Sequence, residues 1–170
     1  MPVQRLNHAV LYVRDVERSH AFYRDVLGFR AKMEIPGVAV FLQAEGSTND
    51  HDLGLFAIGT GAGPSEAGRR TVGLYHLAWE VDTLAELARI RDALLQAGAL
   101  VGASDHSTTK ALYAQDPDGI EFEVSWLLPA DLITDEVREA ALAILPLDLD
   151  REIARYGSRT RGGVGVSVPA

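Results

Sequence analysis

Apolar and polar positions change their spacing several times along the first sixty residues, and each change predicts a new element. Arg5–Val13 is rich in β-branched and aromatic residues, which favours a strand. Asp15 can cap a helix that runs to Leu27, and Gly28 can end it. Three further strands are predicted at Phe29–Ile35, Val38–Ala44 and Asp52–Ile58.

The second half of the chain repeats this order of elements. Gly73–Val81 predicts a strand, and Thr83 with Glu86 has the spacing of a capping box at the start of a helix. Gly98 closes that helix, whose apolar face consists of Leu84, Leu87, Ile90, Leu94 and Leu95. The remaining strands are predicted at Leu100–Ser104, Lys110–Gln115 and Ile120–Trp126, with a tight turn at residues 116–119.

Individual residues also indicate that the two halves are copies of one unit. Leu6, His8 and Val13 match Leu74, His76 and Val81 at a constant offset of 68. Such a repeat indicates two equivalent supersecondary units, here joined by a Gly-rich stretch. We therefore expect an α+β fold in which each unit has the order strand, helix and three strands.

Past the second unit, helical spacing returns at Thr134–Leu145, which stops at Pro146, and at Asp150–Tyr156. The predicted organisation is a first module at residues 1–60, a linker at 61–72, a second module at 73–128, C-terminal helices at 129–157 and a flexible tail at 158–170.

Composition narrows the classes of function. A net charge of −8 argues against a nucleic-acid partner, which needs clustered Lys and Arg. The absence of cysteine excludes disulfides and thiolate metal sites. No apolar run is long enough to span a bilayer, and the N-terminus lacks the features of a signal peptide, so we expect a cytoplasmic protein with no membrane partner.

The repeat also predicts a metal site. If the two units pair about a pseudo-twofold axis, His8 and His76 face each other on one concave surface. A carboxylate from the last strand can complete the set, because Glu121 and Glu123 share one face of that strand. Two histidines and one carboxylate leave open coordination positions, as in non-haem Fe(II) oxygenases.

Four segments together resemble the vicinal oxygen chelate superfamily, which includes glyoxalase I, bleomycin-resistance proteins, fosfomycin-resistance enzymes and type I extradiol dioxygenases. They lie between residues 5 and 126 and read LNHAVLYVRDVERSHAFYRDVLGF, HDLGLFAI, GLYHLAWEV and ALYAQDPDGIEFEVSW. The resemblance implies two βαβββ modules that form a curved, open mixed sheet around a metal site. Here the C-terminal helical extension is an addition to that fold.

The resemblance also assigns the ligands and the metal. Its ligand positions fall on His8, His76 and Glu123, and the offset from the turn selects Glu123 over Glu121. Ile120 departs from the family, which often has Asn at this position. The implied cofactor is a divalent metal, in the first place Fe(II), with Mn(II) as an alternative.

Within the superfamily, the chain looks most like single-domain extradiol dioxygenases of the catechol 2,3-dioxygenase type. Strand 53–58 has no carboxylate to serve as the fourth ligand of glyoxalase I, and Tyr113 precedes Glu123 by ten residues, as that family's tyrosine does. The resemblance implies ring cleavage of a catechol-like aromatic diol by O2. The resemblance further implies that His106 moves protons in this reaction and that Tyr113 binds the substrate. The seven-residue gap between His106 and Tyr113 is shorter than in larger members.

Other interpretations of these residues stay open. The protein could be another metal-dependent enzyme of this fold, of the glyoxalase, isomerase or thiol transferase type, or a non-enzymatic resistance protein that binds a small molecule. His106 could be only a turn residue, and Tyr113 could be core packing. We expect His51 to be solvated rather than in a pocket. Apolar surface on an open sheet further predicts a homodimer.

Overall fold

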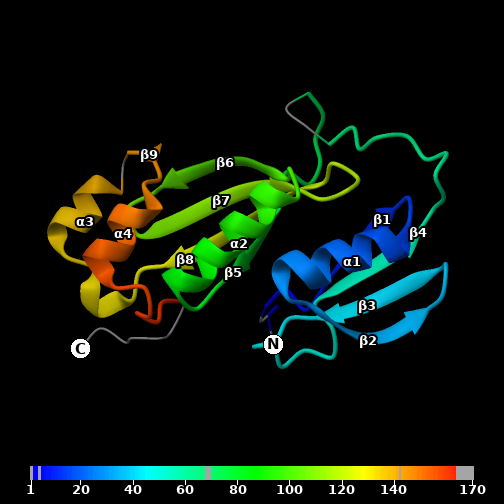
Figure 1. The fold of residues 1–170 in the computed structure, drawn as a ribbon, viewed down its shortest axis with the longest axis horizontal. Helices are drawn as coiled ribbons and strands as arrows, with labels where there is room; N and C mark the ends of the chain where they lie inside the picture. The colour runs from blue at the N-terminus through cyan, green and yellow to red at the C-terminus, as the bar shows by residue number, and fades with distance from the viewer. Residues whose placement is uncertain (1, 4, 68–69, 142, 164–170) are drawn as a thin grey trace. The chain divides into compact units, whose positions relative to one another are not determined.

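The chain divides into two compact units. The computed structural model describes residues 2–3, 5–67, 70–141 and 143–163. The first unit contains the described residues up to Glu66 together with Asp116–Gly119, and the second contains the rest. Each unit has its own sheet and begins with the order βαβββ, which confirms the α+β fold class predicted from the sequence (Figure 1).

The first unit is a four-stranded mixed sheet with one helix. Its strand order is β1-β4-β3-β2, in which β1 and β4 are parallel and the other neighbours are antiparallel. The helix packs against β3 and β4. The elements are β1 (Ala9–Val13), α1 (Val16–Leu27), β2 (Arg30–Ile35), β3 (Ala39–Gln43) and β4 (Leu53–Ala57).

The caps predicted for α1 are present. The Asp15 side chain accepts a hydrogen bond from the Arg18 amide at 2.9 Å, and Gly28 ends the helix in the left-handed conformation with φ 76°. Val16, Tyr23 and Val26 of this helix are buried, and so are Leu11, Val13, Leu42, Leu53 and Leu55 of the sheet.

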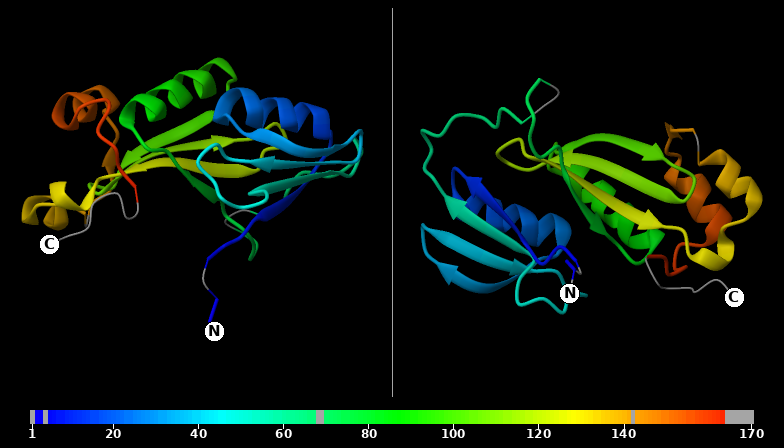
Figure 2. Two further views of the ribbon diagram at one scale, coloured as in Figure 1. Left: turned by 90° about the horizontal axis from the view of Figure 1, so that it is seen from below. Right: turned by 180° about the vertical axis from the view of Figure 1, so that it is seen from behind.

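The second unit repeats this topology and extends it. The strand order β5-β8-β7-β6 matches β1-β4-β3-β2 position by position, and a short strand, β9 (Leu145–Pro146), is added at the β6 edge. The two further views show α2 lying along one face of this sheet (Figure 2). The elements are β5 (Leu77–Glu80), α2 (Leu84–Gln96), β6 (Leu100–Asp105), β7 (Thr109–Gln115) and β8 (Glu121–Leu127).

Side chains alternate across β8 as its sequence predicts. Phe122 and Val124 are buried, whereas Glu121 and Glu123 are only partly covered on the opposite face. Four of the five predicted apolar positions of α2 are also buried, but Leu95 is 58% exposed. It lies at the edge of the helix's apolar face, close to the C-terminal end.

Both first strands are shorter than predicted. β1 begins at Ala9 because its parallel partner β4 begins at Leu53, and these two residues are aligned. In the same way β5 begins at Leu77, opposite Phe122. Without a partner strand, the residues before these points cannot continue the ladder of backbone hydrogen bonds.

The C-terminal extension contains a short 3-10 helix (Ala130–Leu132), α3 (Asp135–Ala140), β9 (Leu145–Pro146) and α4 (Leu149–Tyr156). The predicted helix Thr134–Leu145 is therefore wrong in its second half. Leu145 and Pro146 instead pair with the edge of β6, whose backbone groups need partners. Of the predicted flexible tail, residues 158–163 are hydrogen-bonded, since Gly162 binds Asp82 and Gly163 binds Leu127. Residues 164–170 lie outside the described residues.

No helix in the described part of the chain combines the length and the apolar character that a membrane span requires.

Candidate metal and proton-transfer site

Strand pairing in the second unit gathers three of the predicted site residues. Tyr113 on β7 lies opposite Glu123 on β8, and Glu123 also pairs with Ala78 on β5. His76 directly precedes β5, and its Nε2 lies 3.3 Å from Glu123 Oε2. The ring centroids of His76 and Tyr113 are 6.0 Å apart. One end of β5 thus contributes an imidazole beside a carboxylate and a phenol.

The spacing of His76 and Glu123 fits two ligands of one ion. Two ligand atoms that each lie about 2.1 Å from an ion, at an angle of roughly 100°, are about 3.2 Å apart. Both side chains are largely withdrawn from solvent, with 25% of His76 and 14% of Glu123 exposed. His76 Nδ1 is buried and has no hydrogen-bond partner among the described residues. The distance between these two residues is therefore compatible with two ligands of one ion.

A second group in the same unit links His106 to Tyr113. His106 Nε2 lies 3.1 Å from the Tyr113 hydroxyl and 2.9 Å from Ser104 Oγ. The Ser104 hydroxyl is also 3.3 Å from the Tyr113 hydroxyl, so the three groups form a closed triangle. All three side chains are partly buried. His106 is therefore more than a turn residue bonded to its sequence neighbours, and Tyr113 directs its hydroxyl to polar partners rather than into the core.

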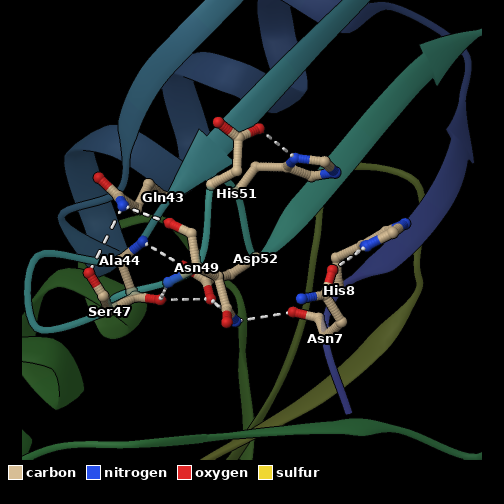
Figure 3. Close-up of polar contacts among 9 residues, drawn as sticks. Asn7, His8, Gln43, Ala44, Ser47, Asn49, His51 and Asp52 are labelled. Atoms are coloured by element: carbon tan, nitrogen blue, oxygen red, sulfur yellow. Dashed lines mark hydrogen bonds and ion pairs between the residues drawn. The ribbon is translucent and has the colours of Figure 1, made fainter.

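In the first unit, His8 lies beside His51. The two ring centroids are 4.5 Å apart, and the His51 ring also meets the edge of Phe41 at 5.1 Å. His8 Nδ1 is 2.7 Å from Asn7 Oδ1, and His51 Nδ1 is 3.0 Å from Asp50 Oδ2 (Figure 3). Because an amide or carboxylate oxygen accepts hydrogen bonds, each Nδ1 is the donor in these contacts, and neither contact involves Nε2. Metal-bound histidines in proteins commonly donate through one ring nitrogen in this way and bind the ion through the other.

Asp52 fixes the loop that brings these two histidines together. Its carboxylate accepts hydrogen bonds from the Ala44 amide at 2.8 Å and from Ser47 Oγ and Asn49 Nδ2 at 2.7 Å (Figure 3). Asn49 Nδ2 also donates to the Asn7 carbonyl at 2.7 Å, which ties the loop to the residue before His8. The position of His8 at the start of β1 thus depends on polar contacts from residues about forty positions later.

In the first unit the pKa values of a carboxylate, Asp50, and of a phenol, Tyr23, are shifted by their surroundings. The hydrogen bond from His51 lowers the pKa of Asp50 below its ordinary value. Burial, and then the negative charge of Asp116, raise the pKa of Tyr23 well above its ordinary value.

The Tyr23 hydroxyl donates to Asp116 Oδ2 at 3.2 Å, and Arg14 binds Asp118 two residues further along. These contacts place the 116–119 turn against α1 within the first unit.

The predicted ligand set is divided between the two units. His8 belongs to the first, and His76 and Glu123 belong to the second. Across the residues that the structure describes, no group of three or more His, Cys, Asp or Glu side chains is arranged to hold a metal ion. Each unit therefore contributes its own histidine, and the three-ligand set remains a proposal.

Two polar residues near these groups were missed at the sequence level. His51 was expected to be solvated, but its ring is partly buried between His8 and Phe41. His51 stands two residues before β4, the strand that pairs with β1, so the pairing brings it close to His8. Ser104 contacts both His106 and Tyr113, and its place opposite Ala111 in the β6–β7 pairing could not be derived before the register was known.

Comparison with known proteins identifies the family. Residues 5–124 match the model of the Glyoxalase/Bleomycin resistance protein/Dioxygenase superfamily. Because the match covers most of the chain and agrees with the paired βαβββ units, the protein belongs to this superfamily.

Two curated relatives are dioxygenases by name. The chain is 30% identical over 119 residues to a catechol-2,3-dioxygenase of Bacillus subtilis (strain 168), a match that covers 70% of this chain and 40% of that protein. It is 31% identical over 137 residues to biphenyl-2,3-diol 1,2-dioxygenase 3 of Rhodococcus globerulus, with 77% of this chain and 68% of the relative covered. The chain thus spans less than half the length of the first relative and about two thirds of the second.

Solved structures support the fold. The crystal structure of a lactoylglutathione lyase from Agrobacterium tumefaciens matches with a TM-score of 0.54 and 23% identity, and covers 74% of this chain and 95% of that one. At this level of identity the likeness concerns the fold, which in this superfamily supports several chemistries.

Proposed function

We propose that this protein is a metal-dependent extradiol dioxygenase that uses O2 to cleave the ring of a catechol-like aromatic diol. The observation that carries the proposal is the His106–Tyr113 contact of 3.1 Å on the same sheet as the His76–Glu123 pair. A proton-transfer group such as His106 beside two possible metal ligands, His76 and Glu123, suits the activation of a hydroxylated substrate. The names of both curated relatives describe enzymes that act on vicinal aromatic diols.

We propose His8, His76 and Glu123 as the ligands, with Fe(II) as the metal and Mn(II) as the alternative. His8 stands one residue before β1, as His76 stands one residue before β5. In each unit this first strand runs parallel to the last strand of the module, so the two histidines occupy equivalent positions. A divalent ion held by these residues would supply Lewis-acid chemistry that lowers the pKa of the diol hydroxyls.

The chain's own residues would then orient the substrate and move its protons. The Tyr113 hydroxyl can hydrogen-bond a substrate oxygen, and Ser104 holds that hydroxyl in place. His106 can take up a hydroxyl proton and return it during ring opening, since an imidazole exchanges protons near neutral pH. His51 offers a second imidazole beside His8. Both atoms of O2 enter the ring-opened semialdehyde or acid, so the overall reaction needs no external reductant.

The test is turnover by anaerobically purified, Fe(II)-loaded protein. Catechol, 3-methylcatechol and 2,3-dihydroxybiphenyl are mixed separately with the protein and O2. We expect one O2 consumed per diol and the appearance of a yellow product. Hydroquinone, whose hydroxyls are not adjacent, is the matched control and should give neither signal. Iron-loaded protein that consumes no O2 with any vicinal diol would contradict the proposal. It would favour another metal-dependent chemistry of the superfamily, for example on a glutathione hemithioacetal.

A further inference from the structure

The turn that carries His106 has a conformation that needs support. Residues 106–108 connect β6 to β7, and the His106 amide donates to the Thr109 carbonyl at 2.9 Å. Ser107 has φ 66°, in the left-handed region that side-chain-bearing residues adopt at a cost. The Ser107 amide donates to Asp105 Oδ1 at 2.7 Å, which closes the turn. The backbone next to His106 therefore depends on contacts that hold it in this shape.

Three elements of the C-terminal extension (residues 129–157) supply such contacts. Ser107 Oγ donates to the Val137 carbonyl in α3 at 2.7 Å. Leu145 in β9 pairs with Asp105 at the end of β6. Glu152 in α4 forms an ion pair of 2.8 Å with Lys110 at the start of β7. The extension thus contacts residues on both sides of the His106 turn, Asp105 before it and Lys110 after it.

The ion pair belongs to a buried chain of charges. Lys110 is 1% exposed and Glu152 is 3% exposed. Lys110 Nζ also lies 2.5 Å from Asp105 Oδ1, the atom that accepts from the Ser107 amide. A buried ammonium group keeps its position when carboxylates compensate its charge, and removing one of them disturbs the others. Glu152 is thereby linked through Lys110 and Asp105 to the turn.

The extension is attached by apolar packing and by polar contacts. A cavity lies between the hairpin and the extension, and Ser107, Lys110, Glu136, Ala140, Leu145 and Glu152 are among the residues that line it. The buried side chains of Val137 and Leu149 pack the extension elsewhere, whereas the polar contacts at Ser107 and Lys110 are the ones that reach the His106 turn.

From this geometry we propose that the C-terminal extension is a positioning element for His106. Glu152, through Lys110 and Asp105, and Val137, through Ser107, hold the turn so that His106 Nε2 meets Tyr113 and Ser104. Glu152 is a positioning residue, since it does not touch His106 itself. The inference rests on the proposed function only where it gives His106 a part in the reaction.

The test compares Glu152→Gln with Asp150→Asn in the full-length, metal-free protein. Both changes remove one carboxylate charge from α4, but the Asp150 side chain is 88% exposed. For Glu152→Gln we expect the NMR signals of the His106 ring to shift and the Ser107 amide to exchange with solvent at least about tenfold faster. Asp150→Asn should change neither. Signals and exchange rates equal to wild type in Glu152→Gln would overturn the proposal.

A second variant guards against loss of the fold in Glu152→Gln. Ser107→Gly keeps the positive φ but removes the hydroxyl that binds Val137. We expect its His106 ring signals to shift as well, and unshifted signals in a folded Ser107→Gly protein would count against the role of Val137.

Turnover then separates this inference from the proposed function. If wild type cleaves diols, Glu152→Gln should lower kcat about tenfold with KM unchanged, because the proton-transfer group is misplaced while the substrate is still bound. An unchanged kcat despite shifted His106 signals would refute the link to catalysis. If wild type has no turnover, the proposed function fails, and the NMR comparison still decides whether the extension positions His106.

Discussion

Tyr113 and Glu123 lie directly opposite each other on the antiparallel strands β7 and β8. Side chains of opposing residues project from the same face of a sheet, so the phenol and the carboxylate share one surface. His76 contacts Glu123 from the position just before the neighbouring strand β5, and His106 contacts Tyr113 from the turn after β6. This strand pairing therefore joins the proposed ligand pair to the proposed proton-transfer pair.

Replacing His106 by Phe should lower kcat by about 100-fold and leave metal binding intact. A positioned acid–base group contributes roughly 10²–10⁴ to a rate, and His106 is not among the proposed ligands. Steady-state kinetics and metal analysis of the same preparation give both quantities. An unchanged kcat would remove His106 from the reaction.

Tyr113→Phe should lower kcat about tenfold or more, and the double variant His106→Phe/Tyr113→Phe should lose less than the two single effects combined. The two groups touch at 3.1 Å, and residues that act together give non-additive losses. Tyr12→Phe is the control, because Tyr12 is 70% exposed on β1. Strictly additive losses would indicate that the His106–Tyr113 contact plays no part in catalysis.

Tyr23 makes the stability of the first unit sensitive to alkaline pH. Its pKa is raised in the folded protein by burial and by Asp116, so the neutral phenol is the form that the fold accommodates. The stability associated with it is complete below the unfolded pKa of about 10 and decreases as the pH rises from there toward the folded pKa. Tyr23→Phe loses the hydrogen bond to Asp116 but cannot ionise.

Urea unfolding of wild type and of Tyr23→Phe at several pH values measures this pH dependence of stability. Near about pH 8, Tyr23→Phe should be less stable than wild type by about 1 kcal/mol, and above about pH 10 the difference should shrink or reverse. A difference that stays constant across this range would show that Tyr23 ionises as easily in the folded state as in the unfolded one.

Asp118 should contribute to stability through its two bonds with Arg14. The Arg14 backbone amide donates to one carboxylate oxygen at 2.9 Å, and its guanidinium donates to the other at 2.8 Å. Only 7% of the Asp118 side chain is exposed, but 26% of Arg14 is, so solvent weakens the effect. We expect Asp118→Asn to reduce the free energy of unfolding by about 1–2 kcal/mol. Asp25→Asn, in an exposed pair with Arg24, should cause no measurable change, and equal effects of both would argue against a special role for Asp118.

The repeated pattern explains why the fold could be predicted so far from the sequence. Asp15 and Gly28 mark the ends of α1 by local chemistry alone, and the alternation around Phe122 and Val124 sets the face of β8. The starts of the strands were harder to predict, because β1 and β5 begin where their partner strands begin. Pairing of β9 with β6 depends on an edge that local sequence does not reveal.

Some residues of the candidate site could be predicted from the sequence, and others could not. The sequence pointed to His76, Glu123, His106 and Tyr113, and the second unit brings all four into contact with one another in pairs. It did not point to His51, whose place beside His8 depends on the Asp52 network between a loop and the start of β1. Interactions between residues far apart in sequence were the ones that spacing could not predict.

Metal content tests the central claim most directly. His8→Ala, His76→Ala and Glu123→Ala are each loaded with Fe(II) without oxygen and freed of excess metal, and their iron is measured against protein. His20→Ala is the control, since His20 lies on α1 and is not a proposed ligand. We predict about one iron per chain for wild type and His20→Ala, and less than about a tenth of that for each ligand variant, with circular dichroism unchanged. A folded variant at any of these three positions that retains full iron occupancy would contradict the assignment.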